Sequence, residues 1–249
     1  MRGAIGVLGA VAMAVLTGGC GGSEACADLG DDVLLTAQLT DNGERARVEV
    51  ELRRPELAAG SIPVKLCEDH GLRVDDVAMT EVKRPSGAVI YEAELDVVSQ
   101  QQPLTRRFEL RTGDGTSEFT ATIDAPGFEI SSPTADSEVS RAAALTITWE
   151  PPHGADAKIA IKVADEIDGT ACLGAPLELE EPDDGEVVVP KSQVELTPEM
   201  PPSDGVCAAF VTLSRAQTVP LTPTGGGSLH PDSRVEATTS RTVSFSSVP

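Results

Sequence analysis

Aromatic and histidine side chains are scarce in this 249-residue chain, which has one Trp, one Tyr, five Phe and three His. His70, His153 and His230 stand apart beside Gly or Pro, so no HxxxH pair can form a helical metal site and each is expected in a surface turn. Carbohydrate binding usually needs exposed rings, but Trp149 and Tyr91 alternate in phase with apolar residues. Both rings are therefore predicted to point into cores, and no metal ligand set is expected.

Motifs for catalysis and phosphate binding are also missing. The chain has no GxSxG or SxxK to activate a serine. Its Gly225-Gly226-Gly227 run lies in a Pro-rich stretch rather than between a strand and a helix. We therefore expect no catalytic residue, no cofactor and no enzymatic activity. The alternative is an exported enzyme or inhibitor whose site is assembled only by the fold.

Basic residues are few, because 19 Lys and Arg stand against 40 Asp and Glu and give a formal net charge of −21 at pH 7. A field of this sign repels nucleic acid, whose binding requires Lys and Arg, so no nucleic-acid partner is expected. An acidic surface also keeps an exported protein soluble. We interpret the acidic clusters Asp28–Asp32, Asp165–Asp168 and Glu180–Glu186 as solvated turns, with calcium binding as the alternative, because they lack the EF-hand spacing.

No apolar run is long enough to span a membrane, which takes about 20 residues. The run Ala4–Leu16 follows the basic Arg2 and leads through small residues to Cys20, in the order of a cleaved export signal. This segment resembles a bacterial lipoprotein signal peptide. The resemblance implies a signal over residues 1–19, cleavage before Cys20, a diacylated Cys20 thiol that anchors the protein in the membrane, and a flexible tether over residues 20–25.

The alternative is a cut after Ala25-Cys26-Ala27, which would release a soluble secreted protein. That cut leaves Cys67, Cys172 and Cys207, an odd number of thiols in an oxidising compartment. A cut before a lipidated Cys20 leaves four cysteines that can pair completely, so the cysteine count favours the lipidated form. In lipoproteins of double-membraned bacteria, Gly21 after the cysteine implies the outer membrane by default.

Apolar residues alternate with polar ones along most of the chain, which is the period of a strand with one buried face. Residues 33–39 and 46–52 show this pattern on either side of the turn Asp41-Asn42-Gly43-Glu44, which predicts a hairpin. The alternation returns over residues 89–97 and 119–123. No stretch of comparable length shows a 3.6-residue period, so the sequence predicts an all-β protein.

The stretch Asp124-Ala125-Pro126-Gly127 interrupts the strand pattern and predicts a boundary between one domain over residues 26–126 and another over residues 127–249. Beyond it, Leu145-Thr146-Ile147-Thr148-Trp149-Glu150-Pro151-Pro152 resembles the second strand of fibronectin type III domains, where an inward tryptophan precedes a Pro-rich turn. The resemblance covers residues 128–248 and implies an immunoglobulin-like β-sandwich. We therefore predict two tandem immunoglobulin-like β-sandwich domains after the signal peptide.

The remaining cysteines fall two in each predicted domain. Pairing Cys26 with Cys67 and Cys172 with Cys207 is one of three possible connectivities, and the only one that keeps each disulfide inside a domain. Each disulfide would close a loop of about 40 residues and contribute roughly 4 kcal/mol in the chain-entropy model.

The connection Ala216–Arg234 is rich in Pro, Thr and Gly and is predicted to be a long loop between strands, with a disordered insertion as the alternative. Sandwich domains carry binding sites on such loops, so the candidate binding residues are Gln217, Thr224, His230 and Asp232. Replacing residues 217–232 with a short turn is expected to leave the fold intact. The predicted function is a non-enzymatic, membrane-anchored cell-envelope lipoprotein that binds a protein partner in the envelope.

Overall fold

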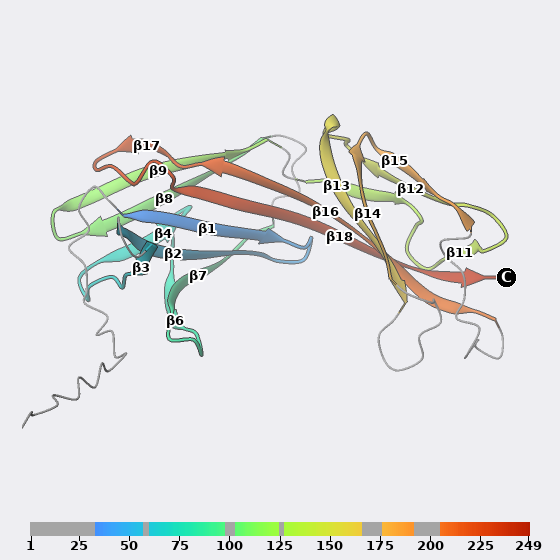
Figure 1. The fold of residues 1–249 in the computed structure, drawn as a ribbon, viewed down its shortest axis with the longest axis horizontal. Coiled ribbons are helices and arrows are strands. Elements are labelled where there is room, and N and C mark those ends of the chain that lie inside the picture. The colour runs from blue at the N-terminus through green and yellow to red at the C-terminus, as the bar shows by residue number, and fades with distance from the viewer. Residues whose placement is uncertain (1–32, 57–59, 98–102, 125–126, 166–175, 192–204) are drawn as a thin grey trace, which may run out of the picture.

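The computed structural model describes residues 33–56, 60–97, 103–124, 127–165, 176–191 and 205–249, most of which form strands (Figure 1). The strands of the first half are β1 (Leu34–Asp41), β2 (Ala46–Glu56), β3 (Gly60–Pro63), β4 (Gly71–Val74), β5 (Val77–Ala78), β6 (Thr80–Lys83), β7 (Val89–Leu95), β8 (Leu104–Thr112) and β9 (Gly115–Ile123). Those of the second half are β10 (Glu129–Ser132), β11 (Ser137–Ser140), β12 (Leu145–Glu150), β13 (Gly154–Asp165), β14 (Leu177–Asp183), β15 (Glu186–Val189), β16 (Cys207–Pro220), β17 (Thr222–Gly225) and β18 (Arg234–Val248). Within these ranges, no helix has the length and apolar character needed to cross a membrane.

One ten-stranded sheet extends along the molecule in the order β14-β13-β16-β18-β1-β2-β7-β6, with β11 beside β18 and β3 beside β2. Two smaller sheets lie at its ends: β17-β9-β8-β4-β5 beside the first half, and β10-β12-β15 beside the second (Figure 1). The structure confirms the all-β prediction. The layers are consistent with β-sandwiches.

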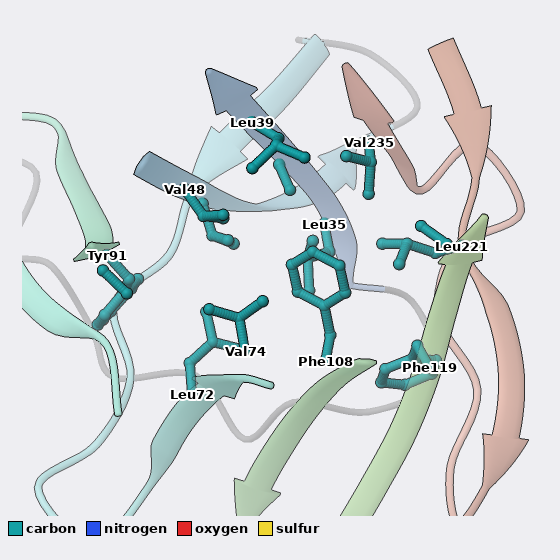
Figure 2. Packing of buried hydrophobic residues seen from close by; sticks show 14 of the residues in the cluster. Leu35, Leu39, Val48, Leu72, Val74, Tyr91, Phe108, Phe119, Leu221 and Val235 are labelled. Carbon is teal, nitrogen blue, oxygen red and sulfur yellow. The ribbon is translucent and has the colours of Figure 1, made fainter. Parts of the chain in front are cut away.

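The first hydrophobic core lies between the five-stranded sheet and the end of the ten-stranded sheet that contains β1, β2 and β7 (Figure 2). The predicted hairpin of residues 33–39 and 46–52 is confirmed, because β1 pairs antiparallel with β2 and places Ala37 opposite Val50. Alternate side chains of both strands therefore point into this core. Tyr91 also points inward, and its hydroxyl oxygen accepts a hydrogen bond from the Leu66 N–H at 2.7 Å.

The second hydrophobic core lies between the three-stranded sheet and the other end of the ten-stranded sheet. Trp149 of β12 is 1% exposed and packs there with Ile147, Ile161 and Leu213. The prediction that Trp149 points into a core is therefore confirmed.

The strands β16 and β18 contribute to both cores. The expected boundary between residues 126 and 127 therefore does not divide the chain into one segment for each core. These strands of 14 and 15 residues pair antiparallel along their whole length, from Cys207 opposite Ser247 to Pro220 opposite Arg234. Leu213 contributes to the second core, whereas Val219 and Val235 belong to the first. A strand of 15 residues spans about 50 Å, which is long enough to serve two sandwiches. Part of residues 127–249 therefore completes the first core.

The connection Ala216–Arg234 is largely built into the fold, so its interpretation as a long loop or a disordered insertion is wrong. Its first residues extend β16, and β17 then pairs with β9, with Thr222 opposite Thr120. Figure 2 shows the Leu221 side chain extending into the first core, to which Phe119 also belongs. Replacing residues 217–232 with a short turn would remove two buried side chains and a strand. We therefore expect such a replacement to lower stability rather than leave it unchanged.

Candidate functional site

The inward face of the two long strands changes from apolar to polar between the cores. Leu213 of the second core and Val219 of the first are both inward residues of β16, and the two inward positions between them carry polar side chains. The same change occurs on β18 between Ala237 and Val243. The polar residues at these inward positions, here called the polar belt, are Arg215, Gln217, Thr239 and Arg241.

Arg215 forms a buried ion pair with Asp183, the last residue of β14. Asp183 is 0% exposed and Arg215 is 6% exposed. The Arg215 Nε and Nη2 atoms donate to the two carboxylate oxygens of Asp183, with 2.8 Å between Nη2 and Oδ1. Trp149 Nε1 also donates to Oδ1, at 2.7 Å, and the Pro151 carbonyl accepts from Arg215 Nη2. Both charges are therefore desolvated but hydrogen-bonded, as buried charges must be.

Both arginines of the polar belt lie over the ring of Phe128. The guanidinium carbon of Arg215 is 4.5 Å from the centre of the Phe128 ring, and that of Arg241 is 5.9 Å away. Arg241 Nη1 also donates to Asp41 Oδ1 at 3.0 Å. Because Asp41 ends β1 of the first core and Asp183 comes from the second half, these contacts connect both halves of the molecule.

A pocket of ≈ 180 Å³ lies beside the buried ion pair. Part of its wall is apolar and part is polar, and the residues come from both halves of the chain. The lining residues are Ile123, His153, Ala157, Lys158, Asp183, Arg215, Ala216, Gln217, Ala237 and Thr239. This pocket is the candidate functional site, because it combines a concave surface with buried, fixed charges.

The structure separates the four candidate binding residues. Gln217 lines the pocket, and its side-chain oxygen accepts from the Asp124 N–H at 3.1 Å. Thr224 lies exposed on β17, and His230 Nδ1 accepts from the Asp232 N–H at 3.3 Å. These last three residues do not line the pocket.

The histidines occupy different environments. His153 is exposed in the turn before β13, as expected, and lines the pocket. The His70 side chain is only 6% exposed, so its prediction as a surface residue is wrong. Its Nε2 accepts from the Gly113 N–H at 3.1 Å, because β4 pairs with β8 and brings these two turns together.

The prediction that the acidic clusters are solvated turns is only partly tested. The interpretation of Glu180–Glu186 as a solvated turn is wrong for Asp183, which is buried. Asp28–Asp32 and residues 166–168 lie outside the described residues. In the described part of the chain, no group of three or more His, Cys, Asp or Glu is placed to hold a metal ion.

Cys67 and Cys207 carry no free thiol. Cys20, Cys26 and Cys172 lie outside the described residues, so the pairing of the cysteines stays a prediction.

Sequence reasoning missed Arg215, Arg241 and Asp183. A signal for the arginines was present, because each stands at an inward position of an alternating strand where apolar residues are expected. Nothing local marked Asp183, which is 32 residues from Arg215 along the chain.

These features define an all-β protein in which two hydrophobic cores share two long strands and meet at a polar belt. No protein-family model matches the chain. No curated protein matches it significantly either.

Proposed function

We propose that the chain is a lipid-anchored protein of the bacterial cell envelope, with the outer membrane as its default location, and that it binds an envelope protein without catalysing a reaction. The observation that carries this proposal is where the chain enters the fold. β1 runs parallel to β18, with Thr36 opposite Arg234, and β18 continues from there to Phe245 in the second core. Val33 therefore lies at the end of the first core that is remote from the second (Figure 1).

The position of Val33 is compatible with attachment of the chain to a membrane through Cys20. Residues 21–32 stand between the proposed lipid on Cys20 and Val33, and a chain of that length reaches at most about 40 Å. The paired strands β16 and β18 then extend for about 50 Å from that end. A lipid on Cys20 would thus place the first core near the membrane and the second core away from it.

The connection between the cores supports a role in which the first core holds the second core out toward a binding partner. The second core is joined to the first by two continuous strands and by the ion pairs of the polar belt, so its position relative to the first core would be fixed. We further propose that both units are immunoglobulin-like sandwiches. Such a scaffold carries binding surfaces at its ends, and the end of the second core would face an envelope partner.

The lipid anchor is tested by Cys20→Ser in cells that export the protein. We expect the wild-type protein in the membrane fraction with the added mass of acyl chains, and Cys20→Ser outside that fraction, because the acylated thiol is gone. Cys26→Ser is the matched control and should stay with the membrane. Recovery of Cys20→Ser in the membrane fraction with wild-type mass would contradict the proposal.

The interaction role is tested in the same cells. Crosslinking of intact cells followed by purification of the wild-type protein should recover an envelope protein in defined stoichiometry. Recovery of no crosslinked envelope protein would contradict this part of the proposal, whatever the result for Cys20.

A further inference from the structure

The acceptor groups of the pocket beside the polar belt are already engaged. Both carboxylate oxygens of Asp183 accept hydrogen bonds from Arg215, and Oδ1 also accepts from Trp149. The Gln217 Oε1 atom accepts from the Asp124 N–H at 3.1 Å. A molecule in the pocket would therefore find these acceptors occupied.

Several donor groups of the same pocket have no described acceptor or only a distant one. Lys158 is exposed on β13, and its ammonium has no acceptor in the described part of the chain. Because Gln217 Oε1 faces the Asp124 N–H, the Gln217 amide nitrogen keeps two N–H groups that no described residue accepts. Among the residues that the structure describes, Arg215 Nη1 donates only to the Gly127 carbonyl oxygen, at a long 3.4 Å. The pocket therefore offers donors.

The side chains that line the pocket carry a surplus of one positive charge. Asp183 and Arg215 neutralise each other, and Lys158 adds a cation without a described counter-charge. This is unusual in a chain whose formal net charge is −21. A monoanion would balance the local charge, whereas a dianion would leave a negative charge next to the Asp183 carboxylate.

The walls of the pocket restrict the ligand further. Apolar side chains line part of the pocket and would contact a short hydrocarbon chain rather than a second charged group. They are Ile123, Ala157, Ala216 and Ala237. The volume of ≈ 180 Å³ leaves room for a small organic molecule, since a water molecule takes about 30 Å³ in the liquid.

We propose that this pocket binds a small aliphatic monocarboxylate. The carboxylate oxygens accept from Lys158, Gln217 and Arg215, and the alkyl chain lies against the apolar wall. This inference goes beyond the proposed function, because it depends on neither the lipid on Cys20 nor an envelope partner. The binding site lies where the two cores meet and includes residues of both halves.

The test is calorimetric titration of the full chain with butyrate. Wild type should bind butyrate at one site, and rising ionic strength should weaken binding because the main attraction is between charges. Lys158→Gln should weaken binding at least about fivefold, whereas Lys158→Arg should stay within about twofold of wild type. The matched control is Lys162→Gln, which removes another exposed lysine of β13 that does not line the pocket and should leave affinity unchanged.

Two further measurements distinguish a loss of the binding site from a loss of folding. Gln217→Met should also weaken butyrate binding, and the unfolding midpoint of each lysine variant should equal that of wild type because both lysines are exposed. Failure of wild type to bind butyrate, or equal loss of affinity in Lys158→Gln and Lys162→Gln, would overturn the proposal. Displacement of butyrate by equimolar inorganic phosphate at constant ionic strength would overturn the assignment of the ligand as a monocarboxylate.

Discussion

At the scale of single residues, the charges at inward strand positions determine how the two cores meet. Moving a carboxylate and a guanidinium out of water costs several kcal/mol for each ion. In the Arg215–Asp183 pair this cost is offset by mutual attraction and by added hydrogen bonds from Trp149 Nε1 and to the Pro151 carbonyl. Such a pair contributes modest net stability when intact, but removing one charge leaves the other buried without compensation.

We therefore expect Asp183→Asn to lower the free energy of unfolding by about 3 kcal/mol, because Arg215 stays buried without a counter-charge. Urea unfolding followed by Trp149 fluorescence measures this change. Asp184→Asn is the matched control, because Asp184 is the exposed neighbour and its only hydrogen bond to a described residue is from the Glu186 N–H, at 3.5 Å. Equal destabilisation by the two substitutions would show that the buried pair has no special role.

At the scale of elements, β17 depends on how closely its end approaches β9. Gly226 has φ +78°, and a Cβ atom there would lie 2.1 Å from the Thr116 carbonyl oxygen and 2.9 Å from Ser117 Cα. Both neighbours are backbone atoms of β9, so they cannot move without shifting the strand. Ser117 Oγ also accepts from the Gly227 N–H at 2.9 Å. The glycines thus allow this Pro-rich segment to lie against the five-stranded sheet.

Gly226→Ala should therefore lower the unfolding free energy by about 2 kcal/mol more than Gly87→Ala. Gly87 is a matched control because its φ of +86° is similar but a Cβ atom there meets nothing within 4 Å. Both variants carry the cost of an alanine in the left-handed region, about 1 to 2 kcal/mol. The difference in urea midpoint isolates the clash with β9, and equal midpoints would contradict the close packing of β17.

Some of the strands could be predicted from the sequence, and others could not. The hairpin of β1 and β2 was predictable, because its two alternating runs flank a turn with Asn42-Gly43, and Trp149 was correctly placed inward from its phase. The full length of β16 was not, because Arg215 and Gln217 interrupt its apolar alternation and the Pro and Gly residues that follow are typical of loops.

Long-range pairing was not predictable for a different reason. β1 and β18 are parallel neighbours, but nothing local in either strand specifies a partner so far along the chain. The Leu35 N–H donates to Ser233 Oγ across 198 residues of sequence. The pocket depends on the same kind of contact, so single residues such as Gln217 were identified while the set that surrounds them was not.

At the scale of the whole molecule, the shared strands couple the stability of the two cores. Unfolding of the first core would release β18 beside β1 and β16 beside β9, and these strands also carry Leu213 and Phe245 of the second core. Each core therefore loses part of its packing when the other unfolds. Tandem domains joined only by a linker would lack this coupling.

The chain carries one natural probe in each core, because its single Tyr, Tyr91, lies in the first core and its single Trp, Trp149, in the second. We expect one cooperative transition, so urea unfolding should give the same midpoint from Trp149 fluorescence and from the ¹⁹F resonance of 3-fluorotyrosine at position 91. Leu35→Ala, at a position in the first core that is 0% exposed, should cost about 3 kcal/mol. The coupling predicts that both probes shift by the same amount in this variant. A Tyr91 midpoint that moves while the Trp149 midpoint stays would show that the cores unfold independently in spite of their shared strands.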